Sequence, residues 1–133
     1  MTHTGSDREA ILARPVTAVL STTWTRGRIH AVPVWFLYED GQIKVITDRG
    51  SQKHRNAVRS GRASLCIPDT GAAGRYLTAE GAVHVVDPLS FEQRLALHRH
   101  YRDEESAQRI VGQGGHERMV MLVMQPETWL DAG

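Results

Sequence analysis

The residues best able to do chemistry lie in the run TDRGSQKHRN, which begins at Thr47. Ser51 has the residue type and the position to cap a helix over residues 52–60. The first turn of such a helix leaves backbone N–H groups without partners, and Lys53 and Arg55 add cationic donors beside it. This combination binds a phosphate or a carboxylate without a metal ion. The alternative is a solvated basic helix face, and the spacing alone does not separate the two.

Strand segments precede this run and must position it. Residues 36–38 and 43–47 are rich in β-branched and aromatic side chains, and Asp40-Gly41 between them predicts a tight hairpin turn. Upstream, residues 29–38 have apolar side chains at both odd and even positions, so both faces of this strand segment must be buried. A small barrel covers one face, and we expect a partner subunit or a flat bound ring on the other. Pro33 cannot donate to a ladder and predicts an edge or a bulge there.

The remaining pattern predicts further strands with helices between them. The expected helices span residues 7–12, 87–101 and 103–111, and the expected strands span residues 16–24, 62–68, 75–86 and 119–124. Asp87 and Pro88 are expected to cap and open the second helix, Gly81 to form a bulge, and Pro126 to end the last strand. The short spacing between most strands favours a mainly β (α+β) fold, a closed antiparallel barrel decorated by helices.

The chain resembles the pyridoxamine 5′-phosphate oxidase-like family of flavin- and deazaflavin-binding split β-barrels. The residues that carry the resemblance are Pro33, Val34, Trp35, Phe36, Thr47, Ser51, Gln52, Lys53 and Asn56. It extends from about residue 8 to the last strand near Met124, and it is closest to small enzymes that use coenzyme F420, the biliverdin reductase-like group. The resemblance implies a split β-barrel with six antiparallel strands in Greek-key order, flanking helices, and a homodimer with the cofactor between subunits.

The resemblance also implies roles for residues at the site. Ser51, Gln52, Lys53 and Asn56, with Arg55 beside them, would hold the phosphate-bearing tail of the cofactor. Thr47 would hold the ribityl end and Pro33, Val34 and Trp35 would pack near the ring, while Arg75 and Tyr76 would reach the partner's site.

The cofactor follows from a difference within the family. The strand from His30 to Trp35 lacks the arginine and the lysine that hold phosphate in pyridoxamine phosphate oxidase, so we do not expect vitamin B6 oxidation. Their absence leaves a more open groove that suits a longer tail with carboxylates, which Arg49, Arg55 and Arg59 would meet at the rim. We therefore expect coenzyme F420, with FMN as the alternative.

Two classes of function stay open. The first is an oxidoreductase, an F420-dependent reductase that transfers hydride to a conjugated organic acceptor, in which the cofactor does the chemistry and no protein nucleophile acts. The second is a carrier that binds F420, FMN or haem without turnover. The sequence does not separate them, because such an enzyme needs no additional catalytic signature.

Composition excludes other classes. A chain of 133 residues suits one domain, residues 1–133, of which the small polar residues 1–6 are expected to be disordered. A net charge of +1 gives no reason to expect nucleic acid, and no run approaches the ~20 apolar residues of a membrane span. The polar start lacks a signal peptide, which favours the cytoplasm. Cys66 is the single cysteine and the histidines follow no ligand spacing, so no metal is expected.

Overall fold

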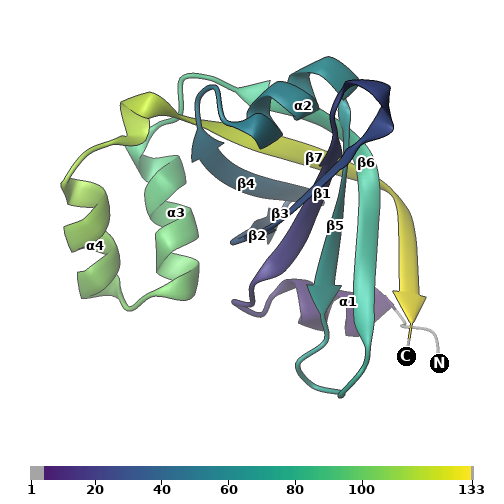
Figure 1. Cartoon of the computed structure of the whole chain (residues 1–133). Helices are drawn as coiled ribbons and strands as arrows, with labels where there is room; N and C mark the ends of the chain where they lie inside the picture. The colour runs from purple at the N-terminus through teal and green to yellow at the C-terminus, as the bar shows by residue number, and fades with distance from the viewer. Residues whose placement is uncertain (1–4, 133) are drawn as a thin grey trace.

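The computed structural model describes residues 5–132, and its strands form one curled antiparallel sheet (Figure 1). The strands are β1 (Ala18–Thr23), β2 (Ile29–Val34), β3 (Leu37–Glu39), β4 (Gln42–Asp48), β5 (Arg62–Pro68), β6 (Tyr76–Val86) and β7 (Met119–Ala132). The helices are α1 (Gly5–Leu12), α2 (Gln52–Ser60), α3 (Phe91–Tyr101) and α4 (Glu104–Gly112), with short 3₁₀ turns η1 (Thr25–Gly27) and η2 (His116–Arg118). The sheet order is β2-β1-β5-β6-β7-β4-β3.

The described part of the chain therefore has a seven-stranded sheet, and the prediction of six strands was wrong. The expected strand over residues 29–38 divides into β2 and β3 because Trp35 and Phe36 leave the ladder. The backbone N–H of Phe36 donates to the Tyr101 hydroxyl at 2.9 Å, and that hydroxyl lies 2.7 Å from the carbonyl of Val16, to which it donates. A side chain far away in the sequence thus takes over a backbone group that a continuous strand would have paired.

The local turn and cap predictions are confirmed. Asp40 and Gly41 both have positive φ, 54° and 73°, which is the conformation of a type I′ hairpin turn between β3 and β4. The Ser51 side chain accepts the backbone N–H of His54, and α2 begins at the next residue. The strands and the cap therefore place the start of α2 as expected.

Gly81 lies at a bulge between β6 and β7, as predicted, but Pro126 does not end the last strand. The register shifts between Glu80 and Gly81, and Gly81 pairs with Pro126. Proline lacks the N–H that a regular ladder needs, and at a bulge that donor is not required. Strand β7 consequently continues past Pro126, and Trp129 packs against the core.

Replacing Gly81 with alanine is expected to destabilise the protein by about 1–3 kcal/mol, the usual range for overpacking. A Cβ at Gly81 would lie 1.9 Å from the backbone oxygen of Gln125, and backbone cannot swing aside. Gly112→Ala is the matched control, because a Cβ there meets no atom within 4 Å. Urea unfolding midpoints measure both variants, and a Gly81→Ala protein as stable as wild type would contradict the close approach.

The prediction for the start of α3 was wrong. The cap is Ser90, whose side chain accepts the backbone N–H of Gln93, while the Gln93 side chain accepts the backbone N–H of Ser90. This capping box satisfies two N–H groups at once, whereas Asp87 is held by Arg49. The cap Asp103 opens α4 as predicted. Helix α1 starts at Gly5, before its predicted start at residue 7, and residues 1–4 of the expected disordered segment lie outside the described residues.

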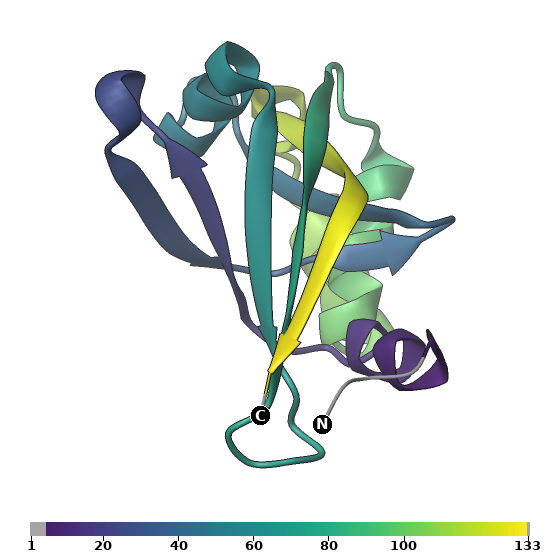
Figure 2. The ribbon, with the colours of Figure 1, turned by 90° about the vertical axis from the view of Figure 1, so that its right-hand side faces the viewer.

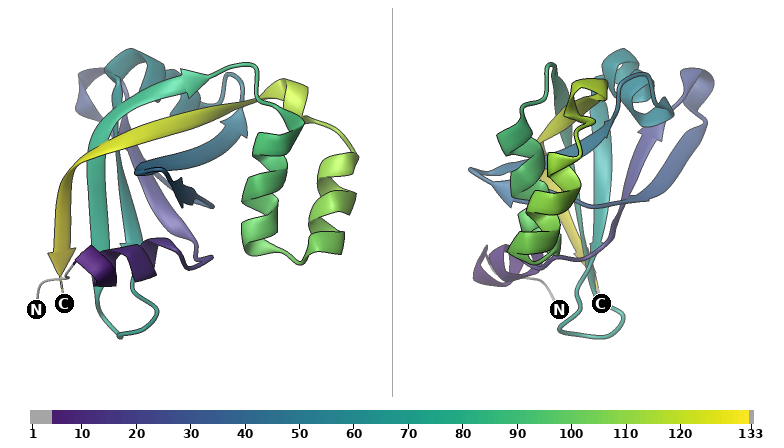
Figure 3. Two further views of the ribbon diagram at one scale, coloured as in Figure 1. Left: turned by 180° about the vertical axis from the view of Figure 1, so that it is seen from behind. Right: turned by 90° about the vertical axis from the view of Figure 1, so that its left-hand side faces the viewer.

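The helices surround the sheet on three sides. Helix α2 lies at one end of the curled sheet and α1 at the other (Figures 1 and 2). Helices α3 and α4 form a pair beside the sheet, with α3 on the inner side (Figure 3). The core lies inside the curl, where Phe36, Leu65, Ile67, Leu77 and Val120 are fully buried. Between residues 5 and 132 no helix has the length and apolar character to cross a membrane.

Candidate functional site

A pocket of about 390 Å³ opens between α3, the end of β2 and the start of α2. We call it the α3 pocket, and its lining residues are Pro33, Val34, Trp35, Ile46, Lys53, Arg94, Leu97, His98 and Met119. Its volume lies within the range of small-molecule sites. The structure thus brings together four residues of the predicted site, namely Pro33, Val34, Trp35 and Lys53.

Lys53 is the predicted phosphate ligand that reaches this pocket. Its side chain has no hydrogen bond or ion pair to any residue of the described range 5–132, and it lies in the first turn of α2. The helix geometry leaves the backbone N–H groups of Gln52 and Lys53 without an intrahelical acceptor. A free ammonium group beside free N–H groups is a favourable site for an anion.

The other predicted phosphate ligands mainly bond to one another. Thr47 and Ser51 share a hydrogen bond of 2.9 Å between their hydroxyl oxygens, and the Gln52 amide donates to Asn56 at 2.8 Å. Asn56, only 2% exposed, donates in turn to the Thr22 hydroxyl at 3.2 Å. These contacts fasten α2 to strands β1 and β4. They fix the position of the helix start that presents Lys53.

The arginines expected at the rim have partners. Arg55 donates to the Gln52 side chain at 2.6 Å, and Arg59 donates to the backbone oxygen of Thr23. Arg49 forms two hydrogen bonds to Asp87, 2.9 and 2.6 Å long, and these bonds lower the pKa of the Asp87 carboxyl. Each of the three guanidinium groups is therefore partly engaged within the chain.

Arg75 and Tyr76 do not join the α3 pocket of their own chain. Strand β6 begins at Tyr76, at the end of the sheet that carries α1 and opposite α2 (Figure 2). Arg75 lies 3.9 Å from the Asp69 carboxylate. The expectation that both residues reach the site of a partner subunit stays a prediction.

Helix α3 supplies a wall that the sequence analysis missed. Arg94, Leu97 and His98 line the pocket, and Tyr101 on the same helix stacks on the Trp35 indole with 4.3 Å between ring centroids and 4° between planes. Arg102 lies over the Trp35 ring, 5.1 Å from its centroid. The spacing of residues 94, 97, 98 and 101 places them on one helix face, which was the available signal.

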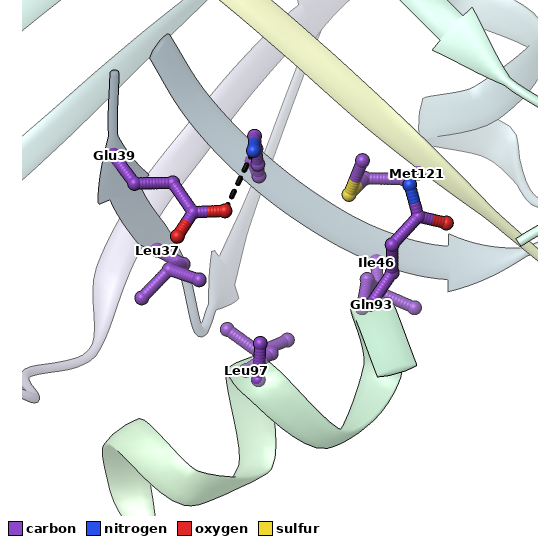
Figure 4. Close-up of a pocket in the computed structure, with 8 residues that line it drawn as sticks. Leu37, Glu39, Ile46, Gln93, Leu97 and Met121 are labelled. Atoms are coloured by element: carbon purple, nitrogen blue, oxygen red, sulfur yellow. Dashed lines mark hydrogen bonds and ion pairs between the residues drawn. The ribbon is translucent and has the colours of Figure 1, made fainter. Parts of the chain in front are cut away.

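Next to the α3 pocket lies a smaller cavity of about 30 Å³ between α3 and strands β3 and β4 (Figure 4). Ile46 and Leu97 line both spaces, and a 2.6 Å ion pair between Lys44 and Glu39 lies at the edge of the smaller one. The space is enough for about one water molecule. Helix α3 therefore does not pack completely against the sheet along this side.

His98 is a neutral hydrogen-bonding group at neutral pH. Burial lowers its pKa below the ordinary value, and the positive charges of Arg94 and Arg102 lower it further. Its Nδ1 atom accepts a hydrogen bond from Arg102 Nε at 3.3 Å. Because arginine stays protonated, the single proton of the neutral imidazole belongs on Nε2.

The lowered pKa of His98 predicts a loss of stability in mild acid. As the pH falls through the ordinary histidine range near about 6.5, the unfolded chain takes up a proton that the folded protein resists. The free energy of unfolding should therefore fall with pH more steeply in wild type than in His98→Gln, measured by urea unfolding from about pH 8 to about pH 5. Equal slopes in the two proteins would show that His98 does not contribute.

A curled antiparallel sheet with flanking helices defines a split-barrel protein. The family model described as pyridoxamine 5′-phosphate oxidase matches residues 7–131. The chain belongs to this family, which confirms the family expected from the sequence. A search of curated proteins gave no significant match.

Solved structures share the fold at low sequence identity. An F420 reductase is 21% identical with a TM-score of 0.75, over 92% of this chain and 94% of that one. A conserved hypothetical protein from Mycobacterium tuberculosis is 19% identical with a TM-score of 0.83, over 98% and 85% of the two chains. HupZ from Group A Streptococcus is 14% identical with a TM-score of 0.64, over 98% and 94%. These similarities establish the split-barrel architecture.

Proposed function

We propose that the protein is an oxidoreductase that binds coenzyme F420 in the α3 pocket and reduces a conjugated organic acceptor. The observation that carries this proposal is the meeting of a partner-free Lys53, at the start of α2, with the apolar segment Pro33-Val34-Trp35 in one pocket. Family membership and the fold shared with an F420 reductase support it. FMN in the same pocket is the alternative.

The residues of the pocket fit such a cofactor. The lining contains Lys53, Arg94 and His98 and no aspartate or glutamate, so an anionic tail meets no repulsion there. Apolar side chains from β2, β4 and α3 provide the surface that a planar ring requires. Lys53 and the N–H groups of the α2 start would hold the phosphate, while Thr47, Ser51, Gln52 and Asn56 would keep that start in place.

A bound deazaflavin would supply the hydride for the reaction. The chain's own residues would bind and orient it: the start of α2 would hold the tail, the end of β2 with Trp35 would contact the ring, and α3 would form the side wall of the pocket. The neutral His98 provides one N–H donor in the same pocket.

Titration of the purified protein with F420 and with FMN tests the cofactor. Trp35 lines the pocket, so intrinsic tryptophan fluorescence should report binding of either compound. We expect micromolar or tighter binding of F420 and weaker binding of FMN. Tight FMN binding without F420 binding would reverse the choice. Turnover with reduced F420 and a panel of enones and quinones then separates an enzyme from a carrier, which would bind and not turn over.

We further propose that the protein is a homodimer. Directly paired residues form a row across five strands on the outer face of the sheet, namely Pro33, Val19, Cys66, Thr78 and Leu130. Val19 is 41% exposed and Leu130 is 54% exposed, and these strands run side by side (Figure 2). A second copy would cover this apolar face, which in a monomer would meet water.

Sedimentation equilibrium tests the dimer. We expect a dimer at micromolar concentration and a shift to monomer in Leu130→Glu, because a buried carboxylate without a partner opposes association. Val58→Glu is the control, since Val58 is 63% exposed on α2 and lies outside the sheet face. A wild-type monomer, with or without cofactor, would overturn the dimer.

A further inference from the structure

Arg94 carries a charge that the described protein does not balance. It is 9% exposed, and its Nη1 atom donates to the backbone oxygen of Gly114 at 2.6 Å. Across residues 5–132 no carboxylate forms an ion pair with it. A guanidinium has five N–H donors, and one carbonyl satisfies one of them.

A structural role accounts for only part of this arrangement. Gly114 follows the C-terminus of α4, which ends at Gly112, so Arg94 lies near the negative end of that helix. A helix end carries a partial charge and does not neutralise a full positive charge. Arg94 lines the α3 pocket, so its remaining N–H groups can meet a ligand there. A carboxylate from outside the chain would supply the counter-charge that residues 5–132 do not.

The two cations of the α3 pocket come from different elements. Lys53 belongs to the start of α2, beside the cap Ser51, where the cofactor tail is proposed to lie. Arg94 belongs to α3, one turn before His98. The pocket therefore offers a second cation, from a separate element, in addition to the one assigned to the cofactor tail.

We propose that Arg94 binds the carboxylate of a planar, conjugated acid, and that acids of this kind are the acceptors of the proposed reduction. The Nε2–H group of His98 and the apolar side chains of Trp35 and Leu97 complete this subsite. A guanidinium recognises a carboxylate with two parallel hydrogen bonds, which an amide or an ester cannot accept in the same way. The role as acceptor rests on the proposed function, whereas binding of the carboxylate does not.

Calorimetric titration of the full-length protein with trans-cinnamate and trans-cinnamamide tests the subsite. The two probes share shape and conjugation and differ in charge. We expect cinnamate to bind at least about tenfold more tightly than cinnamamide, the usual effect of a charge-assisted pair. Equal affinities, or no measurable binding of cinnamate at millimolar concentration, would overturn the proposal.

Variants on α3 test whether Arg94 causes the preference for cinnamate over cinnamamide. Arg94→Met should bring the two affinities close to each other, and Arg94→Lys should keep part of the preference. Arg99→Met is the matched control, because Arg99 lies on the same helix, pairs with Glu104 and does not line the pocket. If Arg94→Met lowers the melting temperature but keeps the full preference, Arg94 only fastens α3 to the Gly114 linker and the proposal is wrong.

Titration of cinnamate in the presence of saturating F420 separates this inference from the proposed function. Retained binding of cinnamate places the subsite beside the cofactor, as the acceptor role requires. Loss of cinnamate binding would assign Arg94 to the cofactor's own carboxylates and overturn that role. If neither F420 nor FMN binds at all, the proposed function fails while the preference for cinnamate still tests Arg94.

Discussion

Replacing Phe36 with alanine is expected to lower the free energy of unfolding by about 3–5 kcal/mol, the range for removing a buried aromatic side chain. Phe36 is fully buried and lies between β2 and β3, where its backbone bonds to Tyr101. The cavity left by the ring would open directly below the segment that lines the α3 pocket. Urea or guanidinium denaturation, followed by tryptophan fluorescence, measures the loss.

Two substitutions control this prediction. Phe36→Leu keeps most of the apolar volume and should lose clearly less stability than the alanine variant. Val58→Ala removes an apolar side chain that is 63% exposed, and it should change the free energy of unfolding by less than about 0.5 kcal/mol. A Phe36→Ala protein with the wild-type midpoint would show that this ring does not organise the core.

Lys53→Ala is expected to weaken cofactor binding about tenfold to hundredfold, with little loss of stability. A charge-assisted bond to a phosphate contributes about 1.5–3 kcal/mol, whereas a partly exposed cation without a protein partner contributes little to folding. Fluorescence titration with F420 or FMN measures the dissociation constant, and a thermal melt checks the fold.

Arg55→Ala is the control for Lys53. Arg55 lies on the same helix, is exposed and bonds to Gln52, and it does not line the pocket. Its loss should leave cofactor affinity close to wild type. If Lys53→Ala binds as tightly as wild type while Arg55→Ala does not, the phosphate role belongs to the arginine, and the α3 pocket does not hold the tail.

The sequence by itself determined the elements whose causes are local. The Asp40-Gly41 turn and the Ser51 cap depend on residues within a few positions of each other, and both formed as predicted. The same is true of the bulge at Gly81, since a glycine in a strand has few other reasons to be there. The spacing of the strands indicated the antiparallel barrel type, and the family, expected from a resemblance, is confirmed by the family model.

Where the predictions from sequence were wrong, contacts between residues distant in the sequence determined the structure. Tyr101 ends the ladder at Phe36 and so adds a strand, and Arg49 engages Asp87, which was expected to cap α3. Pro126 continues its strand because Gly81, distant in sequence, supplies a bulge opposite it. Propensity describes one segment at a time and cannot include a partner that only folding brings near.

The site also contains residues that the sequence indicated and residues that only the tertiary structure revealed. The family resemblance pointed to Pro33, Val34 and Trp35, and the capped basic helix pointed to Lys53; the structure brings the four together in one pocket. The wall of Arg94 and His98 was not identified from the sequence, since it is joined to them only by the packing of α3 beside the sheet. Whether a charged side chain has a counter-ion depends on all the groups packed around it, and these come from several segments of the sequence. An unpaired buried arginine therefore becomes visible only when every element around it is in place.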